Sequence, residues 1–462
     1  MKKIKKVIIV VSSIILSIFL LTGVLALSAF NYGRNTASKL PKKQNVTHYE
    51  METIKAIGKG LYDSKGNYIQ LKGVNFGNWL IQEGWMSVNS IGVKKNEDGS
   101  YNANSEGVID GYYEVYQEEF DEALKNNPNL TDNQIEELMD VYYKSYCQEE
   151  DFINIKNIGF NMIRLPMYYR NFMEGSNDNL TMKENAFELV DWFLEMAKKH
   201  DLYVILDMHG VVGGQSGNEH SGTRDCLFWE NSKYQQSMCE LWQNIALHYK
   251  NERADLATTI AAFDLVNEPA KDKEKTDKVE WEVMDKLYDA IREVDKDHII
   301  AIESCWDFSN LPSTKKYGWK NVMYEYHFYN WNSQTINNDI YYTMNFLTQM
   351  FNEHNVPIYI GEFTFFEQKD EWVKWLNEYD RRGFNWSIWN YKIVSTGWWD
   401  NSWGIYVYKM ELRNYQEKLN IKTATYDEIY ATWSNLSTSK TYNSTGILMK
   451  SLKEYFETCK TY

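Results

Sequence analysis

Eight short apolar runs, separated by longer stretches with the spacing of amphipathic helices, constrain the fold of this chain more than any other feature. Buried parallel strands are near-continuous apolar runs, and alternation with helices is typical of βα units. The runs are Leu71–Phe76, Phe160–Pro166, Tyr203–His209, Ile260–Val266, Ile299–Glu303, Val322–His327, Pro357–Gly361 and Phe384–Trp389. Eight such units predict an α/β fold, a closed (β/α)8 TIM barrel.

Two intervals between the predicted elements are too long for one loop and one helix. The interval Glu83–Gly159 follows the first strand, so we expect a helical insertion there, with acidic helices at Tyr112–Lys125 and Asp132–Asn157. A second insert is expected around Glu411–Thr441, before a closing helix near Thr445–Thr458. Both would enlarge the barrel without adding a strand to it.

The N-terminus has the pattern of a membrane-targeting segment. Met1–Lys6 contains four lysines and Val7–Phe30 contains no charged residue. As a helix, the second stretch would rise about 36 Å, enough to cross a bilayer, whereas a cleaved signal usually has an apolar core of roughly 7–15 residues. We therefore expect a hydrophobic leader helix that acts as a signal anchor. A cleaved signal peptide is the alternative, supported by the triplet Ala26-Leu27-Ser28.

The charge of the leader also predicts where the rest of the chain lies. A positive N-terminus stays in the cytoplasm, which places the following residues outside it. We expect residues 1–30 to be the leader, residues 31–56 a flexible tether and residues 57–462 one barrel domain. The protein would be extracytoplasmic, bound to the cell-surface membrane through residues 7–30, or secreted after cleavage.

Composition excludes several classes of function. A net charge of -15 disfavours nucleic acid, whose affinity comes largely from Lys and Arg. The 5 cysteines are an odd number without a C-x-x-C pattern, which argues against a disulfide scaffold and a thiolate zinc site. A Cys226–Cys239 disulfide is left open by the spacing. Because no Cys/His spacing supports a metal site, we expect neither a metal nor another cofactor.

Polar or aromatic residues stand where six of the eight runs stop. Functional groups of a (β/α)8 barrel lie at the carboxyl ends of its strands, so these positions are candidates for a site. The six ends are Arg164-Leu165-Pro166, Asp207-Met208-His209, Asn267-Glu268, His327-Phe328-Tyr329, Gly361-Glu362 and Trp389-Asn390. A single such residue is as often a helix cap or a structural histidine, but six in register with the barrel indicate a site.

Two of these residues are suited to cleaving a glycosidic bond. That reaction needs a protonated carboxyl beside the leaving oxygen and a second carboxylate facing the anomeric carbon. Strands four and seven lie on opposite sides of an eight-stranded barrel, so Glu268 and Glu362 can face each other across its mouth. A separation of about 5–5.5 Å would make Glu362 a nucleophile and the reaction retaining.

The other strand ends supply suitable surroundings for such a pair. Arg164 and Asn267 can orient the carboxylates and keep them charged. His209 and His327 can hydrogen-bond sugar hydroxyls or tune the pKa values of the pair. The flat apolar face of Trp389 can underlie a sugar ring, a use that fits a chain with 17 Trp and 34 Tyr.

Together these residues resemble glycoside hydrolase family 5, the cellulase-like barrel glycosidases, over about residues 58–403. The family pattern of Arg, His, Asn-Glu, His-x-Tyr, Glu and Trp is matched by Arg164, His209, Asn267-Glu268, His327-Phe328-Tyr329, Glu362 and Trp389. The resemblance implies that Glu268 is the general acid/base and Glu362 the nucleophile. It further implies that Asn267 contacts a sugar 2-hydroxyl, Tyr329 hydrogen-bonds Glu362 and Trp389 underlies the same sugar.

A finer likeness is to the exo-β-1,3-glucanase branch of the family. It rests on Lys72–Leu80 and on the loop from His209 to Gly217, which continues to Ser221-Gly222. In that branch, acidic residues at the positions of Glu83 and about Glu219 close a pocket around the terminal glucose. This chain departs from the branch, with Glu rather than Asp at 219 and with His220 where Asn is expected. The choice between exo and endo action therefore stays open.

The sequence predicts a retaining β-glycoside hydrolase that acts on β-glucan or related oligosaccharides by double displacement. A mannanase or a glycolipid glycosidase with the same mechanism is an alternative. So is a non-catalytic carbohydrate-binding protein of the cell surface on the same fold. The expected partners are a polysaccharide or oligosaccharide substrate and the membrane, with no nucleic acid. The catalytic domain is expected to be a monomer.

Overall fold

The computed structural model describes most of the predicted barrel domain. The described residues are 51–92, 115–271, 278–305, 311–329, 344–345, 347–349, 352–366, 368–394, 403–408, 418–444 and 446–459. The predicted leader, residues 31–50 of the predicted tether and residues 93–114 of the predicted insertion lie outside them. Within the described ranges, no helix combines the length and the apolar character needed to cross a membrane.

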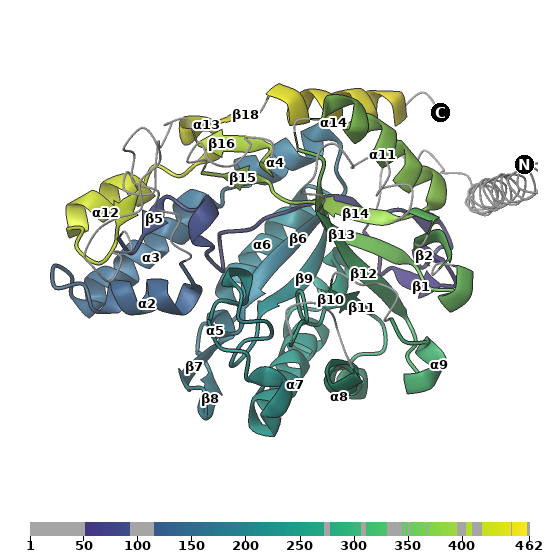
Figure 1. Cartoon of the computed structure of the whole chain (residues 1–462), viewed down its shortest axis with the longest axis horizontal. Helices are drawn as coiled ribbons and strands as arrows, with labels where there is room; N and C mark the ends of the chain where they lie inside the picture. The colour runs from purple at the N-terminus through teal and green to yellow at the C-terminus, as the bar shows by residue number, and fades with distance from the viewer. Residues whose placement is uncertain are drawn as a thin grey trace, which may run out of the picture.

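Eight parallel strands form a closed barrel at the centre of the molecule (Figure 1). In chain order they are β4 (Lys72–Asn75), β6 (Met162–Tyr168), β9 (Tyr203–Gly210), β10 (Ile260–Asp264), β11 (Ile299–Ser304), β12 (Val322–Tyr329), β13 (Ile358–Thr364) and β14 (Asn385–Ile388). Each strand pairs in parallel with the next, and β14 pairs with β4 to close the ring. Every predicted apolar run overlaps one of these strands, which confirms the (β/α)8 barrel.

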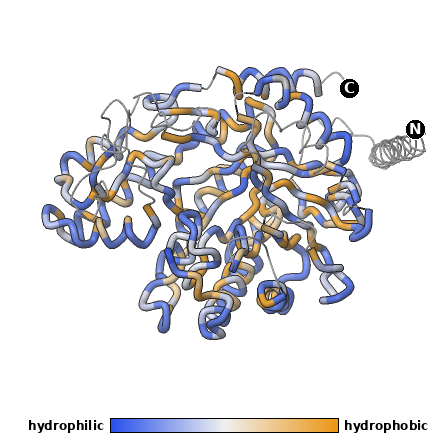
Figure 2. Tube along the Cα trace, viewed as in Figure 1, coloured by the Kyte–Doolittle hydropathy of each residue, from blue (hydrophilic) through white to orange (hydrophobic). Residues whose placement is uncertain are grey.

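Amphipathic helices follow the strands and cover the outside of the barrel. They include α6 (Glu188–Lys199), α7 (Ser232–Leu247), α8 (Lys278–Val294), α11 (Lys369–Arg382) and α14 (Gly446–Cys459). On α6 the buried residues are Val190, Phe193, Leu194 and Ala197, the spacing of a single helix face. Figure 2 shows apolar residues along the central strands and hydrophilic residues on the outer turns.

Helices α2 (Gln117–Lys125), α3 (Asp132–Tyr146) and α4 (Glu149–Ile158) lie between β4 and β6. In Figure 1, α2 and α3 form a lobe with α12 (Tyr426–Trp433), from the far end of the chain. Hydrogen bonds join the two segments, because Asn127 donates to the carbonyls of Ile421 and Ala424 at 2.7 and 2.8 Å. The same lobe contains β17 (Leu419–Asn420), which pairs in parallel with β5 (Asn89–Ser90).

The two ends of the barrel interior differ in polarity. The amino end is apolar, and the strands β1 (Lys55–Ile57), β2 (Gly60–Tyr62) and β3 (Tyr68–Ile69) add to it the side chains of Leu61 and Ile69. Toward the carboxyl end, the buried charged side chains of the interior include Arg164, Asp207, Asp264, Glu303 and Glu325. Burying charge costs free energy unless the charges are paired, so this layer indicates a built polar site above it.

The disulfide that the sequence left open is not formed. Cys226 and Cys239 do not form the disulfide that their spacing allows. Their thiols instead donate to separate backbone carbonyls, those of Lys271 and Lys286, each at 3.7 Å.

Candidate active site

The barrel brings Glu268 and Glu362 together at its carboxyl end. Glu268 follows β10 by a short segment, and Glu362 lies within β13, in register with His327 of β12. One carboxylate oxygen of each glutamate and one ring nitrogen of His327 all lie within 4.8 Å of one another. Both glutamates are buried, with 5% and 4% of their surface exposed.

Glu268 is held at its backbone and at both carboxylate oxygens. Its φ of 42° lies in the left-handed region, and its N–H donates to Glu303 Oε2 at 2.6 Å. His327 Nδ1 lies 2.9 Å from Oε1, and His220 Nδ1 lies 3.0 Å from Oε2. Burial raises the pKa of Glu268 well above its usual value, and the negative charges of Glu362 and Glu83 raise it further.

Glu362 has different neighbours. Arg164 Nη1 donates to its Oε1 at 2.8 Å, and the Tyr329 hydroxyl donates to its Oε2 at 2.6 Å. Burial raises the pKa of Glu362, but the Arg164 guanidinium and the Tyr329 hydrogen bond act to lower it. Since donors to the charged form favour ionisation, the contacts with Arg164 and Tyr329 favour the ionised form of Glu362.

Arg164 of β6 links this pair to the layer of charge below. It is fully buried, and its nitrogens lie 3.2 Å from Asp207, 2.8 Å from Asp264 and 3.4 Å from Glu325. A buried guanidinium needs such partners, because its charge cannot be neutralised by losing a proton. Its Nη2 also donates to Asn267 Oδ1 at 2.9 Å, which fixes the orientation of that amide.

Several buried polar atoms near the carboxylate pair have no hydrogen-bond partner among the described residues, including Glu83 Oε1, His209 Nε2 and Asn267 Nδ2. The first two lie 3.8 Å apart. The other ring nitrogen of His209 lies 2.7 Å from Asp207 Oδ2, and burial lowers the pKa of His209 to about 3, so its ring is neutral. Buried polar atoms without partners are costly, so these three favour a ligand rich in hydroxyl groups.

Aromatic rings form one wall of the same site. Trp389, at the end of β14, stacks on His209 with ring centroids 5.5 Å apart and an interplanar angle of 9°. Trp403 lies 5.3 Å from Trp85 and 5.4 Å from Tyr329, again between ring centroids. Flat apolar faces beside polar atoms suit the two sides of a sugar ring.

Glu219 lies at the rim and contacts the backbone of a loop. Its Oε1 accepts hydrogen bonds from the N–H groups of Gly84 and Val115, the latter at 3.2 Å. Lys418 donates to the carbonyls of Gly84 and Trp85 from the other side. Glu219 therefore positions the loop that carries Glu83, whose Oε2 accepts from Trp85 Nε1 at 2.9 Å.

Several residues of the site were missed in the sequence. Glu303 and Glu325 had a usable signal, because each is an acidic residue inside an apolar run that becomes a buried strand. In the sequence, His220 stands out only as a departure from the branch pattern, and Lys418 had no signal. Both lie on irregular segments that only the fold brings to the site.

Two ligand sets in the described part of the chain are close enough to hold a metal ion. They are Glu268, His327 and Glu362, and Glu303, Glu325 and His327. Arg164 lies 2.8 Å from Glu362 and 3.4 Å from Glu325, so its positive charge opposes a cation at both places. The arrangement favours protons shared among carboxyls over a bound metal.

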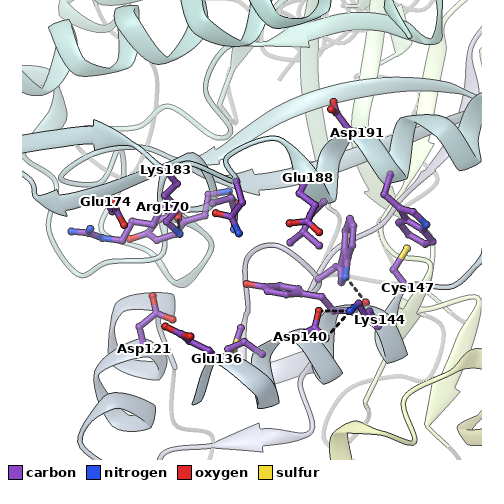
Figure 3. A pocket seen from close by; sticks show the side chains of 18 of the residues that line it. Asp121, Glu136, Asp140, Lys144, Cys147, Arg170, Glu174, Lys183, Glu188 and Asp191 are labelled. Atoms are coloured by element: carbon purple, nitrogen blue, oxygen red, sulfur yellow. Dashed lines mark hydrogen bonds and ion pairs between the residues drawn. The ribbon is translucent and has the colours of Figure 1, made fainter. Parts of the chain in front are cut away.

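A separate groove of about 1550 Å³ lies between helices α2 and α3 and the segment from β6 to α6. It is lined by acidic side chains such as Asp121, Glu136 and Glu188, and by cationic ones such as Arg170 and Lys183 (Figure 3). None of the predicted site residues lines it.

The fold and the site together define a barrel glycosidase architecture, with two facing carboxylates at the ends of the fourth and seventh strands. The sequence model of the cellulase family (glycosyl hydrolase family 5) matches residues 114–395, more than half of the chain. The chain therefore belongs to glycosyl hydrolase family 5, which confirms the predicted family.

Curated relatives agree with this assignment. The chain is 28% identical over 284 residues to a "Beta-xylosidase" of Phanerodontia chrysosporium, covering 60% of this chain and 52% of that protein. It is 26% identical over 293 residues to a "Glucan 1,3-beta-glucosidase" of Lachancea kluyveri, covering 63% of this chain and 61% of that protein. The chain thus spans only about half to three fifths of the length of these relatives.

Solved structures share the fold at low identity. A rutinosidase from Aspergillus niger superposes with a TM-score of 0.54 at 13% identity, covering 70% of this chain and 90% of that one. An endogalactoceramidase superposes with a TM-score of 0.55 at 13% identity, covering 88% and 84%. At this identity, both similarities show the fold alone and do not indicate the substrate.

Proposed function

We propose that this chain is a retaining β-glycoside hydrolase that acts on β-glucan or related oligosaccharides by double displacement. The observation that carries the proposal is that one carboxylate oxygen of Glu268 and one of Glu362 lie within 4.8 Å of each other. Retaining enzymes place their two carboxyl groups about 5–5.5 Å apart, whereas inverting enzymes need about 6.5–9.5 Å to admit a water molecule. The short separation supports direct attack by one carboxylate.

In the first step Glu268 gives its proton to the glycosidic oxygen while Glu362 attacks the anomeric carbon. The bond from that carbon to the leaving oxygen breaks, and a glycosyl ester forms on Glu362. In the second step Glu268 takes a proton from water as that water attacks the same carbon, and the ester bond breaks. The raised pKa of Glu268 suits the donor, and the contacts of Glu362 with Arg164 and Tyr329 suit the nucleophile.

The buried polar atoms without a partner would hydrogen-bond the hydroxyl groups of the sugar. Asn267 Nδ2 would donate to the 2-hydroxyl, and His209 Nε2 would accept from a neighbouring hydroxyl. Glu83 Oε1 would accept from a hydroxyl farther round the ring. Trp389 would lie beneath the same sugar.

The substrate class is supported by the glucan 1,3-β-glucosidases among the curated relatives. A β-xyloside is the second candidate, because a β-xylosidase is 28% identical to this chain. A screen of β-1,3-, β-1,4- and β-1,6-glucans, xylan, mannan and aryl-glycosides, with product sizes followed over time, separates them. A monosaccharide as the first product would establish exo action.

A matched pair of variants tests the two roles. Glu362→Ala should lose activity by several orders of magnitude, and azide should restore turnover with a glycosyl azide of inverted configuration. Glu268→Ala with azide should give the azide of retained configuration, because the nucleophile is intact. Glu136→Gln, an exposed substitution in the separate groove, should match the wild type. Proton NMR that showed inverted configuration in the wild-type product would contradict the proposal.

For location, we propose that residues 1–30 anchor the enzyme so that its barrel faces outward at the cell surface. The pattern of Met1–Lys6 followed by Val7–Phe30 supports this. Fractionation tests it, with the membrane fraction as the expected result. Mature protein found only in the culture medium would favour a cleaved signal instead.

A further inference from the structure

A second histidine, His220, contacts the carboxyl group of Glu268. It lies in the 3-10 turn Glu219–Ser221, in the long loop after β9, and is outside the family pattern described above. Its Nδ1 lies 3.0 Å from Glu268 Oε2, and its Nε2 lies 2.9 Å from Ser216 Oγ. The side chain is 16% exposed, so the ring is largely buried. Each of its nitrogens has a polar neighbour, Glu268 or Ser216.

The contact with Ser216 favours one tautomer of the His220 ring. The Ser216 side chain is fully buried, and its Oγ already accepts the backbone N–H of Asn218 at 3.3 Å. Among the described residues, the acceptor within hydrogen-bond distance of this hydroxyl hydrogen is His220 Nε2, 2.9 Å from Oγ. A neutral imidazole that accepts at Nε2 carries its hydrogen on Nδ1, and that hydrogen points at Glu268.

We propose that His220 is a positioning residue that orients Glu268 and adjusts its proton affinity by donating Nδ1–H to Oε2. This rests on the proposed role of Glu268 as acid/base. His327 holds the other oxygen of the carboxyl, so the two imidazoles fix its plane from both sides.

The environment of Glu268 explains why a donor is needed there. Besides His220, the charged and titratable groups around it include Glu83, Arg164, Asp207, Glu303, Cys305, His327, Tyr329 and Glu362. Burial and the negative charges of Glu362, Glu83 and Asp207 all raise the pKa of Glu268. A hydrogen bond to the ionised form opposes this.

Three substitutions separate the two contacts of the ring. The amide nitrogen of Asn lies about where Nδ1 of His lies, so His220→Asn keeps a donor to Glu268. The longer side chain in His220→Gln reaches the Nε2 position, so it keeps the contact with Ser216 and loses the donor. His220→Ala loses both, and melting temperatures confirm that each variant folds.

The first measurement needs no turnover. The Glu268 carboxyl is titrated by carbon-13 NMR in the whole chain labelled at glutamate, with its signal assigned by Glu268→Gln. His220→Gln and His220→Ala should raise its pKa by about one to two units, the effect of losing a hydrogen bond to a charged group. His220→Asn should stay close to wild type. An unchanged pKa in both His220→Gln and His220→Ala would overturn the proposal.

The second measurement uses leaving groups of different basicity. His220→Gln should lower kcat/KM for alkyl glycosides about 10–100-fold, because their departure needs the acid. Dinitrophenyl glycosides, which leave without it, should change less than about threefold. Equal loss on both substrates would make His220 merely structural and overturn the proposal. A wild type inactive on every β-glycoside would instead overturn the proposed function, while the titration would still decide the role of His220.

Discussion

At the scale of single residues, Glu268 occupies a backbone conformation that few L-residues adopt. A φ of 42° costs free energy, which the surrounding structure has to offset. The N–H of Glu268 donates to Glu303 Oε2 at 2.6 Å, and Glu303 is 1% exposed. A carboxylate on the neighbouring strand therefore holds the proposed acid in its unusual conformation.

Glu303→Ala should remove this support and reduce both activity and stability. The N–H of Glu268 would be buried without an acceptor, which costs about 1–3 kcal/mol. We expect kcat to fall at least about tenfold, together with the melting temperature. Glu303→Gln keeps an oxygen acceptor and should retain most of both. If Glu303→Ala kept full activity, the contact would have no role in placing Glu268.

The same scale shows what the sequence could and could not predict. The sequence predicted Arg164, Asn267 and His327 because they stand where apolar runs stop. In the barrel the carboxyl ends of the strands lie together, so these side chains are close to one another. His220 reaches Glu268 through a loop whose path depends on turns and glycines rather than on periodicity. A residue without a periodic neighbourhood can be placed only after the fold is known.

At the scale of elements, β12 and β13 meet closely below the carboxylate pair. Their register shifts between Tyr326 and His327, and Gly361 lies on β13 beside this irregularity. A Cβ at Gly361 would lie 1.7 Å from Glu325 Oε1 and 3.0 Å from His327 Nε2. The absence of a side chain therefore makes room for two charged or polar groups in the barrel interior.

Gly361→Ala should displace Glu325 and His327 and so damage the site. We expect a lower melting temperature and a loss of kcat of at least about tenfold, since overpacking a core typically costs about 1–3 kcal/mol. Gly446→Ala is the control, because a Cβ there meets nothing within 4 Å at the start of α14. Equal behaviour of the two variants would argue against the close packing at Gly361.

Elements also differ in how well the sequence predicts them. The eight strands were located because buried parallel strands are near-continuous apolar runs. The contact of α3 with α12 was not predicted, although both helices fall in intervals expected to be enlarged. Pairing between segments almost 300 residues apart, such as Asn127 with Ile421 and Ala424, depends on tertiary packing that local pattern does not encode.

At the scale of the whole molecule, a layer of buried charge crosses the barrel beneath the site. Arg164 pairs with Asp207, Asp264 and Glu325, and Glu303 lies in the same layer. Each of these four acidic side chains is at most 1% exposed. Burial raises the pKa of Asp207 to about 7 and that of Asp264 to about 6, although Arg164 opposes both shifts. The folded barrel therefore retains protons that the unfolded chain would release.

This predicts that the free energy of unfolding falls as the pH rises through about 7. An unfolded Asp titrates near 3.9, so above that value the folded state binds more protons and loses stability until Asp207 ionises. Buried neutral histidines have the opposite effect, but only below their unfolded pKa of about 6.5.

Urea unfolding should therefore show lower stability at pH 8 than at pH 6.5. Asp207→Asn should reduce this difference, whereas Asp178→Asn, at an exposed position, should leave it unchanged. Equal stability of the wild type at both pH values would mean that the layer is already ionised at pH 6.5.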